Sequence, residues 1–146
     1  MWWLVSQVIG GILVLGSYFY YLPKIPTERL WVGLNASWRT LYTISILLSG
    51  VAYLSFLYLN RRRTIHPLSL FLFLIAASLW SPSLYYFPQQ KWITILSLCL
   101  VSATVGWALA LEPTSHVYNR MLLGYLLFHV FVMDNIGWSI RYFFIP

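Results

Sequence analysis

The sequence has very few acidic residues and a single cysteine. Three of its 146 residues are Asp or Glu, and all charged residues together make up 8% of the chain. So few carboxylates leave little for general acid–base catalysis, and Cys99 alone permits no internal disulfide. The sequence has no Ser-His-Asp arrangement with a nucleophile turn, no metal-spaced Cys/His cluster and no glycine-rich phosphate loop. We therefore expect no catalytic residues, no metal site and no required cofactor.

Charge is also absent over long stretches. Residues 1–23, 40–60, 64–90 and 92–111 contain no charged side chain, and a fifth apolar segment up to about residue 140 is interrupted by Asp134. A helix of about 20 apolar residues crosses the hydrocarbon core of a bilayer. Strands of a membrane barrel would be about half as long and would alternate in polarity, which these stretches do not. Each segment therefore predicts a transmembrane helix.

We expect a single domain, residues 1–146, folded as an all-α integral membrane protein with a long first loop over residues 24–37. The five transmembrane helices of this bundle are expected at about residues 2–22, 38–60, 67–88, 92–111 and 118–140. The first helix lacks the basic n-region and the A-x-A-like site of a cleaved signal peptide. We therefore expect it to be retained as part of the structure.

The nine basic residues give a net charge of +6 and lie at the ends of the predicted helices. This placement is typical of side chains that anchor to lipid phosphates, and the three arginines at 61–63 form the densest group. We therefore expect membrane lipids as partners and no nucleic acid. The two sides of the bundle carry nearly equal numbers of basic residues, so the positive-inside rule does not fix the orientation.

Aromatic residues make up 19% of the chain, with eight Trp and eleven Tyr. Trp and Tyr at helix ends suit a membrane interface, but Tyr53, Trp80 and Trp107 lie inside predicted helices. Pro82, in the stretch SLWSPSLYYFP, is expected to kink its helix and so to turn Trp80 and Tyr85 toward the bundle interior. Rings in that position would either fill the interior or line a cavity for a flat apolar ligand.

Three aromatic motifs follow one another along the chain. WVGLNASWRTLY contains a W-x-x-x-Y pattern at Trp38 and Tyr42, and LWSPSLYY contains W-x-P at Trp80, followed by an aromatic pair. The third motif, WALALEPTSHVYNRMLLGYLLF, begins with Trp107 and includes Tyr125. In content and order these motifs resemble the translocator protein family, the tryptophan-rich sensory proteins.

The chain also departs from this family's pattern. Its first loop has no Trp between the two prolines, Ala77 stands where the family has Asn, and Gly124 stands where the family has Pro. Asn135 lies close to, but not at, the position of the family's helix-five Asn. These differences fall among residues that shape and cover the family's ligand pocket.

The resemblance implies a flat apolar ligand, either a tetrapyrrole or a sterol-like molecule, that is bound in an aromatic-lined pocket and is transported or sensed. The ligand-binding residues that it implies are Trp38, Tyr42, Trp80, Pro82, Tyr85, Trp107, Tyr125 and Asn135. It also implies a mitochondrial or bacterial envelope membrane. The alternative is a small accessory subunit of a large respiratory or photosynthetic membrane complex, with a filled aromatic interior. A homodimer also stays open.

His129 and Asp134 are the two ionisable residues well inside a predicted helix, where such groups are costly and often functional. They are five residues apart, so on a regular helix they would not share a face. We expect Asp134 to pair with Arg39 or Arg141, or to lie near the membrane interface. Haem ligation by His129 would need a second intramembrane histidine, and the other histidines fall in loops. A proton or ion pathway through His129 and Asp134 is a third interpretation.

Overall fold

The computed structural model describes residues 2–31, 34–60, 67–87 and 89–140, and all regular secondary structure in these ranges is helical. Five helices in this part of the chain are long and apolar enough to cross a membrane. The predicted number and type of long helices are therefore confirmed. The arginines at 61–63 and Arg141, which the sequence analysis assigns to lipid anchoring and to a pair with Asp134, lie outside the described residues.

The chain forms its helices in the following order. The long ones are α1 (Trp2–Tyr21), α3 (Ala36–Leu59), α4 (Pro67–Tyr86), α5 (Lys91–Leu111) and α6 (Val117–Phe128), and α6 continues as the π-helix η2 (His129–Trp138). The first loop contains the short 3-10 helix η1 (Leu22–Lys24) and the short helix α2 (Thr27–Trp31). Asn35 fixes the start of α3, because its side chain accepts a hydrogen bond from the backbone N–H of Trp38 (3.0 Å). α4 continues as a helix through Pro82.

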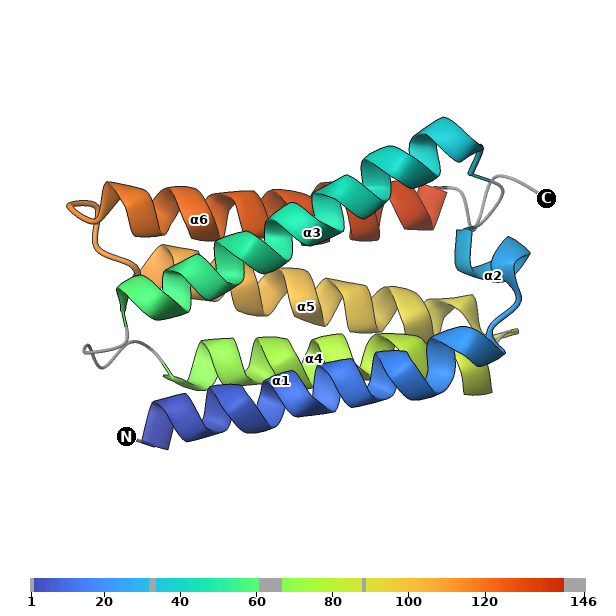
Figure 1. Ribbon diagram of the computed structural model, residues 1–146, viewed down its shortest axis with the longest axis horizontal. Coiled ribbons are helices and arrows are strands. Elements are labelled where there is room, and N and C mark those ends of the chain that lie inside the picture. Colours follow the sequence, from blue (N-terminus) through green and yellow to red (C-terminus); the bar gives the residue numbers. More distant parts are fainter. Residues whose placement is uncertain (1, 32–33, 61–66, 88, 141–146) are drawn as a thin grey trace.

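The long helices pack in pairs that are distant in sequence. α1 packs against α4, α4 against α5, and α5 against α6 and η2, while α3 packs against α6 and η2 (Figure 1). Gly10 permits the close approach of α1 to α4, since a Cβ at this position would lie 2.6 Å from Cδ1 of Leu74. α1 and α3, although consecutive long helices, thus belong to opposite sides of the bundle.

The first loop folds over one end of the bundle. Ile25 is buried with Leu84 of α4, Leu98 of α5 and Trp138 of η2. Nε1 of Trp138 also donates a hydrogen bond to the backbone oxygen of Leu30 (3.4 Å). These contacts attach the loop to three of the helices, so it covers the interior at this end.

A polar cluster joins the helices near the opposite end. Nδ2 of Asn119 donates to Oδ1 of Asn60 (2.8 Å) and to Oε1 of Glu112 (2.7 Å), and Nδ2 of Asn60 donates back to Oδ1 of Asn119 (3.1 Å). Nδ1 of His116 lies 3.0 Å from the same oxygen of Glu112. Because Glu112 is buried, these partners replace the water it would otherwise bind. The cluster connects the end of α3 to the turn between α5 and α6.

Candidate ligand-binding cavity

A cavity of about 610 Å³ lies inside the bundle. Residues of α1, α2, α3, α4, α5, α6 and η2 line it, and most of them are aliphatic or aromatic. Ligand sites in proteins have volumes of about 300–1,000 Å³ and are mostly apolar, with a few polar groups that orient the ligand. The cavity is therefore of the size and character of a small-molecule site.

Buried residues of the packed helices form the closed walls of the cavity. Phe73 and Ala77 of α4 and Leu98 and Val101 of α5 are buried and line it. Trp31 of α2 lines the cavity on the side of the first loop. A ligand in the cavity would thus contact apolar side chains on several sides.

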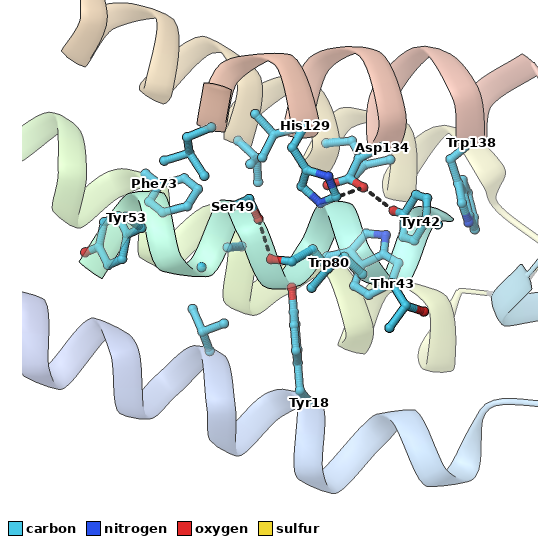
Figure 2. A pocket seen from close by; sticks show the side chains of 18 of the residues that line it. Tyr18, Tyr42, Thr43, Ser49, Tyr53, Phe73, Trp80, His129, Asp134 and Trp138 are labelled. Carbon is cyan, nitrogen blue, oxygen red and sulfur yellow. Dashed lines mark hydrogen bonds and ion pairs between the residues drawn. The ribbon is translucent and has the colours of Figure 1, made fainter. Parts of the chain in front are cut away.

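Polar groups gather at one end of the cavity (Figure 2). The hydroxyl of Tyr42 donates a hydrogen bond to Oδ1 of Asp134, and Nε2 of His129 lies 3.6 Å from the same oxygen. On the other side of the imidazole, Nδ1 of His129 is hydrogen-bonded to Oγ of Ser45 (2.8 Å). Four side chains from α3 and η2 therefore form one continuous series.

The π-helix explains how His129 and Asp134 come together. The backbone hydrogen bonds of a π-helix join residues five apart, so η2 places His129 and Asp134 on the same face, one turn apart. The sequence-based expectation that these residues do not share a face is wrong, because it assumed α-helical geometry. An acid and a histidine five residues apart in an apolar helix are the signal that could have indicated this turn.

Asp134 also has partners other than those expected. The expected ion pair with Arg39 is wrong: Nε of Arg39 donates to the backbone oxygen of Leu34 (2.7 Å). Tyr42 is the hydrogen-bond donor to Asp134 instead. The two residues are far apart in the chain, so no local sequence pattern could have indicated this contact.

The series of Ser45, His129 and Asp134 contains the residue types of a hydrolytic triad, which the sequence analysis did not find. Ser45 is buried within α3 and does not line the cavity, whereas His129 and Asp134 do. A molecule in the cavity would therefore meet the imidazole and the carboxyl group rather than the serine hydroxyl. Among the described residues, no group of three or more His, Cys, Asp or Glu side chains is placed to hold a metal ion.

The structure brings two of the eight residues implied by the family resemblance to the cavity. Tyr42 and Trp80 line it. The other six do not line it and are Trp38, Pro82, Tyr85, Trp107, Tyr125 and Asn135. Trp38, Tyr85 and Trp107 are exposed on the bundle surface, and Nδ2 of Asn135 donates to Sγ of Cys99 (3.3 Å). A ligand-binding role for these six residues stays a prediction.

Further aromatic and polar groups at the cavity were not among the predicted site residues. Tyr18 of α1 points toward Trp80, with the two rings in an edge-to-face arrangement at 5.8 Å (Figure 2). Tyr53 lines the cavity and donates its hydroxyl hydrogen to Oε1 of Gln7. Nε1 of Trp80 is buried and has no hydrogen-bond partner among the described residues. Since a buried donor is rarely left unpaired, this N–H would gain a partner from a bound molecule that displaces the side chains covering it.

Comparison with protein-family models, with curated proteins and with solved structures finds no match for this chain. The likeness to the translocator protein family therefore rests on the three sequence motifs, and its implications belong to the proposal that follows.

Proposed function

We propose that this chain is a multi-pass membrane protein that binds a flat apolar molecule, of the tetrapyrrole or sterol-like class, in the cavity inside its bundle. Transport or sensing of that molecule would follow from such binding. The observation that carries the proposal is the cavity of about 610 Å³, because a bundle stabilised only by packing would fill this space. Five long apolar helices support the membrane location.

The cavity offers two kinds of contact to such a ligand. Trp80, Tyr18 and Tyr42 present aromatic surfaces on which a flat ring system could pack. The unpaired Nε1–H of Trp80 could donate to a carbonyl or carboxylate at the ligand's edge, and the carboxyl group of Asp134 could accept from a hydroxyl or an amine. The apolar walls would then supply most of the affinity, and these groups would set the orientation.

The alternative function, an accessory subunit of a membrane complex, predicts a filled interior and partner helices on the outside. The cavity of about 610 Å³ is unfilled space inside the bundle and does not fit this prediction. The exposed aromatic and aliphatic side chains on the outer surface, such as Phe19 and Leu47, suit lipid chains as well as partner helices. Ligand binding is therefore the function that the geometry supports best.

The test is a titration of the purified chain, in lipid nanodiscs, with protoporphyrin IX, followed by quenching of Trp fluorescence. We expect saturable quenching with micromolar affinity. Trp80→Phe keeps an aromatic ring and removes the N–H, so it should weaken binding by about fivefold, which corresponds to one hydrogen bond of about 1 kcal/mol. Thermal unfolding of the ligand-free variant checks that it folds, because the smaller ring also loses packing against Tyr18 and the cluster of Leu84 and Leu98.

Trp107→Phe is the matched control, since Trp107 is exposed and does not line the cavity. Its affinity for protoporphyrin IX should equal that of the wild type. Linear, non-saturable quenching that is alike in all three proteins would refute ligand binding of this class. The aromatic interior would then be a packing feature, and the accessory-subunit function would become the better proposal.

A further inference from the structure

The cavity has one side that is not closed by buried residues. Of the residues that line it, those that are exposed to the outside all belong to α1 and α3: Leu15 of α1, and Thr43, Ile46, Gly50 and Leu54 of α3. The exposed fractions are 59% for Leu15, 40% for Ile46 and 64% for Leu54. By contrast, the cavity residues of α4, α5, α6 and η2 are buried or half-buried. The space inside the bundle therefore communicates with the outside between α1 and α3.

The packing of the helices produces this opening. α1 lies along α4, and α3 lies along α6 and η2 (Figure 1). Both α1 and α3 contribute residues to the lining of the cavity, so they flank it instead of packing along each other. A hydrogen bond from the hydroxyl of Tyr53 to Oε1 of Gln7 links the two helices toward the N-terminal end of α1. Apart from this link, Tyr18 of α1 also extends toward α3 (Figure 2), and the exposed cavity residues of the two helices are Leu15, Thr43, Ile46, Gly50 and Leu54.

Two glycines enlarge the opening. Gly11 of α1 and Gly50 of α3 both line the cavity, and a Cβ added to either would meet no atom within 4 Å. Neither glycine is therefore explained by close contact between helices, in contrast to Gly10, where a Cβ would collide with Leu74. Their effect is to leave free space at the rim.

If the long helices span a bilayer, as proposed, the opening lies at the depth of the hydrocarbon core. Gly11 and Leu15 are near the middle of the candidate span Trp3–Lys24, and Ile46 and Gly50 are near the middle of the span Ala36–Leu59. Exposed apolar side chains surround these positions, among them Ile12, Leu47 and Val51. On the side of the aqueous phase the first loop lies over the bundle end, with Trp31 among the cavity residues. The opening between α1 and α3 thus faces the depth of the lipid chains, while the first loop lies over one end of the bundle.

We propose that the gap between α1 and α3 is a lateral portal through which the ligand passes between the bilayer core and the cavity. The substrate class is then a molecule that dissolves in the hydrocarbon layer, with an apolar body and one polar group that reaches Asp134 or Trp80. This inference rests on the proposed function, since it assigns the route to the same site. It predicts that added bulk at the portal slows both association and dissociation, because the ligand passes the rim residues on its way in and out.

The experiment measures the kinetics of binding with an uncharged, lipid-dissolved probe, protoporphyrin IX dimethyl ester. The probe is delivered from phosphatidylcholine vesicles to the protein in phosphatidylcholine nanodiscs, and stopped-flow Trp quenching gives the association and dissociation rates. The portal variant is Gly11→Leu with Gly50→Leu. Its two leucines should slow both rates by about threefold to tenfold. The ligand must push a leucine side chain out of its preferred rotamer at each passage, and the cost of that displacement adds to the barrier. Because both glycines also line the cavity, the diagnostic result is the fall of the association and dissociation rates together, whatever the change in the dissociation constant.

The matched control is Gly16→Leu with Val51→Leu. Gly16 is on α1, has no atom within 4 Å of an added Cβ and does not line the cavity, and Val51 is exposed on α3 outside the cavity. These substitutions should leave both rates unchanged. A graded series of Ala, Leu and Phe at Gly50 alone, with rates falling in that order, provides the same test if the double variant does not fold.

The possible outcomes distinguish failure of the portal from failure of the proposed ligand-binding function. Saturable binding with equal rates in the wild type, portal and control proteins would overturn the portal and leave the cavity as the binding site. Loss of affinity in the portal variant through faster dissociation, with the association rate unchanged, would make the glycines part of the site and would also overturn the portal. Absence of saturable binding in the wild type would overturn the proposed function and the portal together.

Discussion

Replacing Tyr42 by Phe removes the hydroxyl group that donates to Asp134 and leaves the ring in place. The ring keeps its edge-to-face contact with Trp31 (5.9 Å) and its contact with His129 (5.7 Å). What is lost is one hydrogen bond to a carboxyl group at the bundle interior. Asp134 would then keep only His129, whose Nε2 is 3.6 Å away. The substitution therefore tests a single interaction.

The expected loss of stability is about 1 kcal/mol. Hydrogen bonds to charged groups in soluble proteins contribute about 1.5–3 kcal/mol, whereas those between membrane helices average about 0.6 kcal/mol and reach about 1.7. The value for Tyr42 should lie between these, because Asp134 has one weak alternative partner. It corresponds to an increase of the unfolding constant by about fivefold.

A double-mutant cycle with Asp134→Leu isolates the contribution of the hydrogen bond between Tyr42 and Asp134 to the free energy of unfolding. In the Asp134→Leu background the hydroxyl has lost its acceptor, so Tyr42→Phe should then cost nothing or stabilise the protein. The assay is reversible unfolding in mixed micelles of mild detergent and SDS, followed by circular dichroism. Tyr118→Phe is the control, because Tyr118 is 78% exposed on α6, and it should leave stability unchanged. Equal costs of Tyr42→Phe in both backgrounds would refute the contact between α3 and η2 at this end of the cavity.

Two further predictions concern the packing of the bundle. Gly10→Ala should lower stability by about 1–3 kcal/mol, because its Cβ would lie 2.6 Å from Cδ1 of Leu74. Gly16→Ala should not lower it, because a Cβ there meets no atom within 4 Å. Thermal unfolding in detergent compares the two variants, and equal melting temperatures would contradict the close approach of α1 to α4. Asn119→Leu should cost about 1–3 kcal/mol, because it removes the main hydrogen-bond donor to the buried Glu112; an unchanged unfolding midpoint would contradict the polar cluster.

The number of long helices could be predicted from the sequence because charge-free runs of about 20 residues have few other structures available. The start of α3 is likewise a local matter, since Asn35 caps it with its own side chain. Which face of a helix points inward could not be predicted. In a membrane bundle the outside is as apolar as the inside, so the hydropathy of Trp107 and Trp80 is the same although one is exposed and the other lines the cavity.

The contacts at the polar end of the cavity could not be predicted from the sequence for a different reason. Its contacts join α3 to η2, and they depend on a π-helical turn that brings His129 within reach of Asp134. Propensities of single residues do not distinguish a π-turn from an α-turn, and pairing across the bundle depends on how whole helices fit together. The sequence indicated that these two residues were unusual, but not that they act as a pair.

The pairing of helices also has a consequence for how the protein is made. α1 packs on α4, and α3 packs on α6 and η2, so each of the first two long helices leaves the ribosome well before its partner. During this interval Tyr42 and Ser45 lack the side chains to which they bind. A chain that ended before residue 117 would leave these two hydroxyl groups without their partners on η2. Completion of the bundle is thus a late step, because synthesis of α6 and η2 supplies the partners of α3.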